Sequence, residues 1–436
     1  MLLQFNVTNF LSFKNEAVLS LYANKDSSHE QNLLSYNKER ILPSVAVYGA
    51  NAAGKSNLHK ALTAAIVLIR QSSNLQINQP LFLISPFMMD DESRNNPTRF
   101  DFIYTNNGIK YEYSFTADKT NIIEEYLYEY TSAKPSMIFE RTNINEFQFT
   151  AKTKPILAKF VEQNTPNKLF LATATSWNCE ITKNAYMWFA EMIDTYDSNN
   201  LLGTMFDQLD QSKKNGDGSL EKFMRTLLKN ADINISNFDY EIIERETKQF
   251  PFALPAGLKI DENQFPDGRG ILQERRIVTH HTINNNGNKK EYLLNFDSES
   301  NGTIRLFTYG PILKNALEKG RTIIIDEIDN ALHPSLTKSL IEMFQNPNIN
   351  KNGAQLIFNT HEVSLLDLDT FRRDQIYFVE KDNNSAESDL YSLDEFSPRK
   401  TENIQKGYLQ GRYGAIPILN LGDIKWWEER QERNVV

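Results

Sequence analysis

One glycine-rich segment, Gly49-Ala-Asn-Ala-Ala-Gly54-Lys55-Ser56, constrains the possible folds of this chain more than any other feature. It satisfies the pattern G-x-x-x-x-G-K-[ST] and stands between a short β-branched stretch, Ser44–Tyr48, and a helical pattern that begins at Ser56. In such a strand–loop–helix unit the glycines let backbone N–H groups turn toward a phosphate, and the helix N-terminus adds partial positive charge. The segment therefore predicts a phosphate-binding loop.

This prediction gives individual roles to the residues of the loop. Lys55 is expected to reach the β- and γ-phosphates of a nucleotide, and the Ser56 hydroxyl is expected to ligate Mg²⁺. The predicted nucleotide-binding residues are Gly49, Ala50, Asn51, Ala52, Ala53, Gly54, Lys55, Ser56 and Asn57. The alternative is a glycine-rich turn that fits the pattern by chance, and the flanking strand and helix disfavour it.

A second motif is a pair of carboxylates at the end of an apolar strand pattern. The stretch Thr322–Ile325 leads directly into Asp326 and Glu327. At such a strand end, Asp326 is suited to hold Mg²⁺ through water, and Glu327 is suited to act as the general base toward an attacking water. Alone, the pair is equally well explained as a solvated acidic turn, but the phosphate-binding loop in the same chain favours the catalytic interpretation.

Two weaker motifs lie on either side of this pair. His361 follows the strand pattern Gln355–Asn359, where a neutral imidazole would meet the γ-phosphate, although a lone histidine is usually structural. The segment Glu299-Ser300-Asn301-Gly302-Thr303 begins a helical pattern. Ser300 and Gly302 offer a hydroxyl and backbone donors for an anion, although an ordinary capped helix has the same residues.

The predicted secondary structure differs between three segments of the chain. Residues 1–150 contain several strand patterns, including a predicted hairpin from Phe100 to Phe115, and a polar loop at Asp26–Arg40. Residues 151–235 carry mostly helical spacing, which predicts a short helical insertion. Residues 236–436 end in alternating helix and strand patterns, with a further helix expected between Asn359 and Gln375. This alternation predicts an α/β fold with a mostly parallel sheet and flanking helices.

Composition excludes several classes of protein. The chain has 436 residues, of which 40% are hydrophobic, so it is not disordered as a whole, and its net charge of −9 argues against a uniformly basic nucleic-acid binder. Its single cysteine, Cys179, cannot form an internal disulfide. No apolar run approaches the ~20 residues of a membrane helix, and the N-terminus has no signal-peptide pattern. We therefore expect a cytoplasmic protein without membrane contact.

The order of these motifs resembles the ATP-binding-cassette (ABC) ATPase heads of the SMC/OLD type. The resemblance implies a P-loop NTPase head of ABC type, with an N-terminal antiparallel β-lobe, and it implies ATP and Mg²⁺ as cofactors. It also implies ATP hydrolysis in a homodimer or higher oligomer, where the signature Ser300-Asn301-Gly302 of one subunit completes the ATP site of the other. Asp329 matches the D-loop, which touches the partner's site.

Three further segments resemble bacterial phage-defence ATPases of the RloA/AbiL-like, abortive-infection group. These segments are Asn9–Lys14, Pro86–Thr98 and Gly407–Pro417. The resemblance implies a nucleotide-gated sensor or regulator in anti-phage defence. Only about 75 residues follow His361, and they lack the converging carboxylates of a nuclease, so we expect a separately encoded effector protein, plausibly a nuclease.

Two other functions remain open. One is an SMC-like ATPase of DNA repair or chromosome maintenance that binds nucleic acid directly, and the other is a nucleotide-gated scaffold that does not hydrolyse ATP. The first is suggested by a cluster of basic residues, although a solvated hairpin explains this cluster better. The cluster comprises Arg269, Arg275, Arg276, His280, His281, Lys289 and Lys290.

Overall fold

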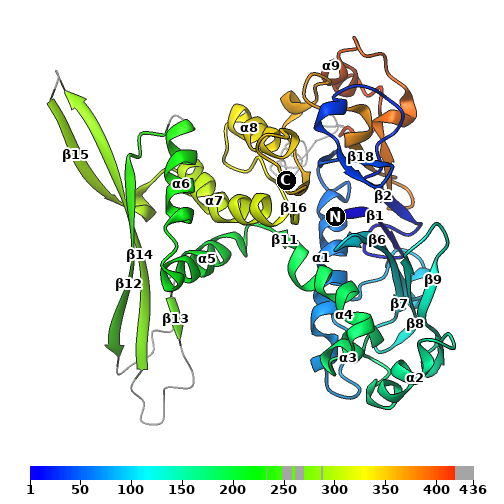
Figure 1. Cartoon of the computed structure of the whole chain (residues 1–436). Helices are drawn as coiled ribbons and strands as arrows, with labels where there is room; N and C mark the ends of the chain where they lie inside the picture. The colour runs from blue at the N-terminus through cyan, green and yellow to red at the C-terminus, as the bar shows by residue number, and fades with distance from the viewer. Residues whose placement is uncertain (232, 248–257, 261–269, 286–287, 418–436) are drawn as a thin grey trace, which may run out of the picture.

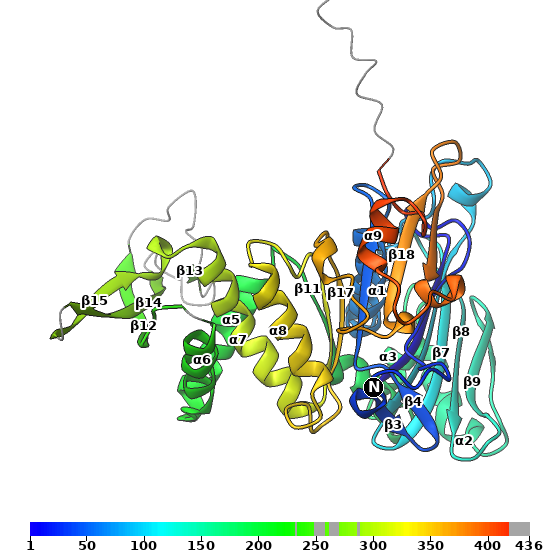
Figure 2. The same cartoon turned by 90° about the horizontal axis from the view of Figure 1, so that it is seen from above.

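The computed structural model describes residues 1–231, 233–247, 258–260, 270–285 and 288–417. Its elements form successive layers, which Figures 1 and 2 show from two directions. An antiparallel sheet is followed by helix α1, a mostly parallel sheet, a group of helices and a projecting sheet. The predicted α/β fold is confirmed, with the parallel sheet at its centre.

The antiparallel sheet has the order β10-β9-β8-β7-β6-β1-β2. Its strands are β1 (Leu2–Thr8), β2 (Ala17–Ser20), β6 (Thr98–Asn106), β7 (Ile109–Ala117), β8 (Ile122–Tyr130), β9 (Ser136–Asn143) and β10 (Glu146–Gln148). Along β6, Phe100, Phe102 and Tyr104 are buried at alternate positions, as a strand with one face on a core requires. The predicted hairpin joins β6 to β7 through Asn107 and Gly108, which both have left-handed backbone angles.

The central sheet has the order β11-β16-β17-β5-β18-β19. Its strands are β5 (Ser44–Gly49), β11 (Ile193–Tyr196), β16 (Thr322–Ile325), β17 (Gln355–Asn359), β18 (Ile376–Lys381) and β19 (Ser388–Ser392). The first five in this order run parallel, and β19 pairs antiparallel with β18. The loops after β5, β16 and β17 therefore leave the sheet at the same edge, where ligands of open α/β sheets bind.

Both faces of the central sheet are covered. On β5, Val45 and Val47 belong to the core shared with the antiparallel sheet and α1 (Lys55–Gln71). The alternate residues Ala46 and Tyr48 belong to a second core, shared with α7 (Asn301–Lys319) and α8 (Pro334–Gln345). A strand buried on both faces reads as a continuous apolar run, which explains why β5, β16 and β17 were predictable from their sequences.

The segment 151–235 contains helices in two groups and one unpredicted strand. The helices are α2 (Lys154–Leu157), α3 (Phe170–Ser176), α4 (Glu180–Met187), α5 (Leu201–Asn215) and α6 (Ser219–Asn230). Helices α3 and α4 lie with the antiparallel sheet, whereas α5 and α6 pack on α7. Between the two groups, β11 pairs in parallel with β16, so this segment supplies an edge strand of the central sheet. With four residues and two polar ones at its centre, β11 gives little sequence signal.

A third sheet projects beyond α5 and α6, at the left of Figure 1. It consists of β12 (Asn237–Thr247), β13 (Leu258–Ile260), β14 (Gly270–Asn285) and β15 (Asn288–Asn295). The long strand β14 pairs with β12 on one edge and with β13 and β15 on the other. The rings of Phe238 and Phe307, 4.8 Å apart, join this sheet to α7. The projecting sheet is therefore packed against the helix that begins at the predicted signature.

Two predicted elements are wrong. The expected loop Asp26–Arg40 contains most of a short hairpin, β3 (Leu34–Tyr36) with β4 (Glu39–Ile41). The helix expected after β17 is replaced by two single 3₁₀ turns, Val363–Leu365 and Arg373–Gln375. In the first turn the Glu362 side chain accepts the N–H of Ser364, so a local side-chain bond replaces helical backbone bonding.

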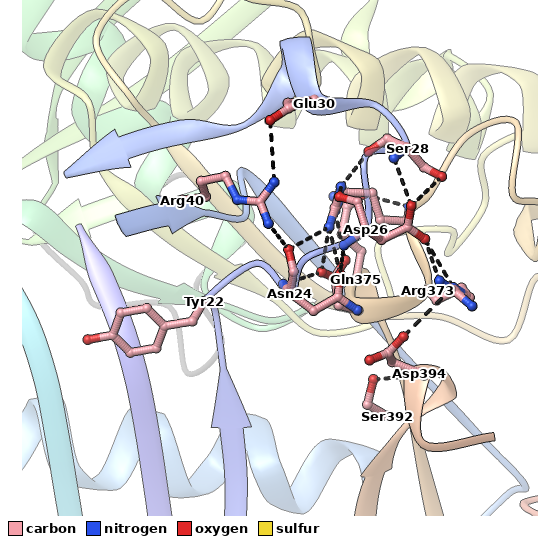
Figure 3. Close-up of polar contacts among 12 residues, drawn as sticks. Tyr22, Asn24, Asp26, Ser28, Glu30, Arg40, Arg373, Gln375, Ser392 and Asp394 are labelled. Carbon is pink, nitrogen blue, oxygen red and sulfur yellow. Dashed lines mark hydrogen bonds and ion pairs between the residues drawn. The ribbon is translucent and has the colours of Figure 1, made fainter. Parts of the chain in front are cut away.

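A polar cluster ties the N-terminal loop to the start of β18 (Figure 3). The buried Arg372 guanidinium donates to Asp374 at 2.8 Å and to the backbone oxygen of Asp26 at 2.8 Å. The neighbouring Arg373 donates to the Asp26 carboxylate at 2.6 Å. Although burial raises the pKa of Asp26, hydrogen bonds from Ser28, Arg373 and Lys400 hold that pKa below its ordinary value. This cluster fixes the N-terminal end of β18 (Ile376–Lys381), and the other end of β18 borders the phosphate-binding loop.

Candidate nucleotide-binding site

The phosphate-binding loop connects β5 to α1, as the sequence predicts. Gly54 has a φ of 118°, a conformation that favours glycine, and it lies immediately before the first residue of α1. At Gly49 an added Cβ would lie 2.3 Å from the backbone oxygen of Val379 on β18, so no side chain fits there. The two glycines therefore allow the loop to turn sharply beside β18 and to present the N-terminus of α1.

Lys55 lies buried inside this loop. Its Nζ donates to the backbone oxygens of Gly49 at 2.8 Å and Ala50 at 3.1 Å, and it lies 3.5 Å from Nδ1 of His361. Burial lowers the pKa of Lys55 to about 8, although the nearby carboxylates of Asp326 and Glu327 act to raise it. The loop thus holds its cation close to the ends of both β16 and β17.

Two serines outside the predicted motif brace the loop. The Ser388 hydroxyl donates to the backbone oxygen of Ala53 at 2.6 Å, and the Asn57 side chain donates to the Ser12 hydroxyl at 2.8 Å. Ser12 and Ser388 also meet each other, because the Ser388 N–H donates to the Ser12 backbone oxygen at 2.7 Å. Ser12 lies in the Asn9–Lys14 segment already identified, but Ser388 carries no sequence signal because it is placed by the β18–β19 hairpin.

Asn359 joins the two predicted catalytic carboxylates. Its Nδ2 donates to the Asp326 carboxylate, and its Oδ1 accepts the backbone N–H of Glu327 at 2.6 Å. Glu327 has a φ of 52°, a left-handed conformation that is uncommon for glutamate. Asn359 is 4% exposed, so these bonds are sheltered from water. Sequence reasoning treated Asn359 only as the last residue of a strand and missed this contact.

His361 and Asp329 approach each other at the same edge of the sheet. The backbone N–H of His361 donates to Oδ2 of Asp329 at 3.3 Å, and the imidazole itself is exposed next to Lys55. The other carboxylate oxygen of Asp329 is buried, and the described residues give it no hydrogen-bond partner. The structure therefore brings Lys55, Asp326, Glu327, Asp329 and His361 together, although they come from three separate loops.

Ser300 and Gly302 are placed at the start of α7. The Ser300 hydroxyl accepts the N–H of Thr303 at 3.1 Å, which is an ordinary helix N-cap, and Ser300 is exposed. An added Cβ on Gly302 would lie 2.9 Å from the backbone oxygen of Ala331, so the helix start packs directly on the Asp329 loop. Within the described part of the chain, Ser300 makes its side-chain hydrogen bonds to Thr303 and not to the phosphate-binding loop.

The predicted Mg²⁺ residues supply oxygen ligands. No cluster of three or more His, Cys, Asp or Glu side chains suited to a metal ion occurs in the described ranges. Ser56 and Asp326 offer a hydroxyl and a carboxylate, and Mg²⁺ commonly takes its other ligands from water and nucleotide phosphates. These residues therefore fit a metal ion that binds together with a nucleotide.

Two open pockets flank the loop. The first, of about 480 Å³, is lined by Leu11, Ser12, Asn57 and the segment 85–89. The second, of about 410 Å³, is lined by Ala50–Ala53, the turn 380–383 and residues 415–417. The Pro86 and Gly407–Pro417 segments singled out in the sequence thus border the phosphate-binding loop.

Three residues of the basic cluster suggested as a DNA-facing edge, Arg275, His280 and His281, lie against acidic side chains. His280 lies 2.9 Å from Asp239 and 3.2 Å from Glu291, and Arg275 forms an ion pair with Asp210. His281 lies 2.7 Å from Glu299. Lys289 and Lys290 are exposed, and Arg269 lies outside the described residues. Among the described helices, none has the length and apolar character needed to cross a membrane.

Comparison with known proteins gives one family and several solved structures. The chain resembles an SMC head bound to the C-winged helix domain of ScpA, with 11% identity, 90% of this chain and 97% of that chain covered, and a TM-score of 0.42. It also resembles the SMC head domain from Thermotoga maritima, with 11% identity, 90% and 98% covered, and a TM-score of 0.38. None of the curated proteins compared with it matches.

The family match covers most of the site. Residues 44–367 match the family described as "AAA domain, putative AbiEii toxin, Type IV TA system". This range includes the phosphate-binding loop, the predicted signature, the Asp326-Glu327 pair and His361. The chain therefore belongs to this family of AAA-type P-loop proteins.

Proposed function

We propose that this chain binds and hydrolyses ATP with Mg²⁺ at the edge of the central sheet, in a dimer or higher oligomer. The observation that carries the proposal is the convergence of Lys55 with His361, 3.5 Å away, and with the carboxylates of Asp326 and Glu327. A cation for the phosphates, a metal ligand and a base are the parts that phosphoryl transfer to water requires.

Each residue has a role in this proposal. Lys55 leaves the loop carbonyls to bind the β- and γ-phosphates, and backbone N–H groups of Gly49–Asn57 surround them. Glu327 accepts the proton of the attacking water, and Asn359 holds the Glu327 backbone in place. His361 faces the γ-phosphate. Mg²⁺, when bound, neutralises phosphate charge, and Ser56 and Asp326 would hold it.

The proposed site is completed by a second subunit. Ser300 is exposed at the N-terminus of α7, where it caps the N–H of Thr303. In our proposal its hydroxyl and the N–H groups that precede Thr303 meet a phosphate from another chain. Gly302 packs on the loop that contains Asp329, so signature and D-loop form one continuous surface. A two-fold dimer that uses this surface would contain two equivalent sites.

We further propose that ATP turnover gates a separately encoded effector protein, with a nuclease as the candidate effector, in cytoplasmic anti-phage defence. The description of the matched family, with its toxin and toxin–antitoxin terms, supports this role. Direct DNA binding is less well supported, because Arg275, His280 and His281 face acidic partners. A scaffold that binds ATP without hydrolysing it differs from our proposal in a single measurable property, turnover.

Mixing two inactive subunits tests the composite site. Ser300→Arg places a bulky cation where the partner's phosphate would arrive, and Lys55→Ala removes the cation of the phosphate-binding loop. A heterodimer of the two variants carries both lesions in one site and leaves the other intact. We expect the mixture to regain part of the wild-type ATPase rate. Mass measurement shows whether heterodimers form. If they form and the mixture still has no ATPase activity, the proposal of a site shared between two subunits is contradicted.

A further inference from the structure

We infer that Glu299 is a positioning residue that fixes the signature serine to the projecting sheet. This inference rests on the proposed function, because it assigns a role to the residue next to Ser300. The Glu299 side chain is only 7% exposed, and its Oε1 lies 2.7 Å from Nε2 of His281. The Thr279 hydroxyl donates to the same oxygen. A buried carboxylate thus holds β14 at the residue before the N-cap of α7.

The contact of Glu299 also involves the strand that pairs with β14. Thr279 is fully buried, and its hydroxyl oxygen also lies 3.2 Å from the backbone oxygen of Leu294 on β15. The hydroxyl has a single hydrogen, which the shorter contact to Glu299 takes. Glu299 therefore contacts a hydroxyl that lies close to both strands of the β14–β15 hairpin. Burial of a carboxylate is costly without such donors, so the geometry is strongly determined.

The consequence for the proposed reaction is positional. The backbone at Glu299 and the first turn of α7 set the direction of the Ser300 hydroxyl. A shift of about 1 Å in a group that stabilises a transition state lowers a rate by roughly 100-fold. Displacement of the β14–β15 hairpin, whose β15 is exposed along its whole length, would then change turnover at the partner's ATP site. The position of the projecting sheet in one subunit would therefore control the rate of ATP hydrolysis at the site of its partner.

Glu299→Ala tests this role directly. We expect kcat for ATP hydrolysis to fall roughly 10- to 100-fold, while the Kd for ATP of the isolated subunit stays within about twofold of wild type. Glu299→Gln keeps an oxygen that accepts from Thr279 and His281, so it should restore most of the rate. Asp297→Ala removes an exposed carboxylate two residues away and serves as the matched control, with a rate near that of wild type.

Thr279→Val provides a second test in case Glu299→Ala fails to fold. Valine has nearly the shape of threonine, so this variant keeps the packing and removes only the hydroxyl, and it should lower kcat without lowering ATP affinity. A folded Thr279→Val or Glu299→Ala protein with the wild-type kcat, or a loss of ATP affinity that accounts for the whole effect, would overturn the inference.

Complementation separates this inference from the proposed function. Glu299→Ala mixed with Lys55→Ala should recover activity, and Glu299→Ala mixed with Ser300→Arg should not, because the two lesions then occupy both sites. One outcome is that Ser300→Arg and Lys55→Ala complement each other while Glu299→Ala fails to show the same pattern, which is recovery with Lys55→Ala and no recovery with Ser300→Arg. In that case only the role of Glu299 is wrong. If Ser300→Arg and Lys55→Ala fail to complement, the composite site itself is wrong.

Discussion

The side-chain oxygen of Asn359 accepts the backbone N–H of Glu327 at 2.6 Å. This bond joins the end of β17 to the second residue after β16 and supports a left-handed glutamate with a φ of 52°. Strained backbone of this kind costs about 1–3 kcal/mol and persists only where neighbouring groups hold it. The proposed general base is thus oriented by a neutral amide from the adjacent strand.

Asn359→Ala should therefore separate positioning from binding. Loss of the amide leaves the Glu327 N–H unpaired and Asp326 without its donor, so we expect kcat for ATP hydrolysis to fall at least roughly 10-fold with ATP affinity nearly unchanged. The unfolding free energy should fall by about 1–3 kcal/mol. Asn348→Ala, at an exposed position before the same strand, should leave kcat unchanged. Steady-state kinetics and thermal unfolding of both variants check this expectation.

Glu327→Gln should bind ATP and retain it. The amide keeps the shape of the side chain but cannot accept the proton of the attacking water. We expect turnover to fall at least roughly 100-fold and ATP to stabilise a dimer, visible as a doubled mass by light scattering. Glu342→Gln, an exposed glutamate on α8, is the control. Turnover at the wild-type rate in Glu327→Gln would place the base elsewhere.

ATP affinity should weaken as the pH rises above about 8, because burial lowers the pKa of Lys55 to about 8. Below this pH the ammonium is present in the free protein; above it, binding must first protonate the amine, which costs up to about tenfold in affinity per pH unit. Lys55→Arg keeps its charge throughout, so its affinity, whatever its absolute value, should not show this decline. Calorimetric titration with ATP between pH 7 and about pH 9.5 measures both profiles.

Asp26→Asn should destabilise the fold without altering the ATP site. The variant removes the carboxylate that Arg373 contacts at 2.6 Å and leaves Arg373 only its longer ion pair with Asp394, at 3.7 Å. We expect a loss of about 1–3 kcal/mol in unfolding free energy. Because the pKa of Asp26 is lower in the folded state, its contribution is fully present above its unfolded pKa and is lost as the pH falls toward the folded pKa. The difference between wild type and variant should therefore narrow below about pH 4.

Glu30→Gln is the matched control for this prediction. Glu30 pairs with Arg40 at 3.4 Å in the same region, but its side chain is 61% exposed. Exposed pairs contribute little, so this variant should stay within about 0.5 kcal/mol of wild type at every pH. Equal losses in the two variants would show that the buried geometry of Figure 3 is not what stabilises this loop.

The sequence alone determined the parts of this protein in which local pattern and chemistry coincide. Strands β5, β16 and β17 are buried on both faces and read as apolar runs, and the residues that follow them are Gly49–Ser56, Asp326-Glu327 and His361. Since parallel strands present their carboxyl ends at one edge, their meeting point was also predictable. The prediction of a helix after β17 was wrong. The Glu362 side chain accepts the N–H of Ser364 there, and a single 3₁₀ turn forms in place of the helix.

Only the tertiary structure decided which distant residues support these motifs. Asn359, Ser388 and Glu299 act through contacts with residues 32, 335 and 18 positions away, and no periodicity encodes such pairs. The same holds for β11, which is too short to give a pattern and becomes a strand because β16 offers it an open edge. The basic cluster is similar: its residues are visible in the sequence, but the acids beside Arg275, His280 and His281 are brought close by strand pairing and packing, which composition does not record.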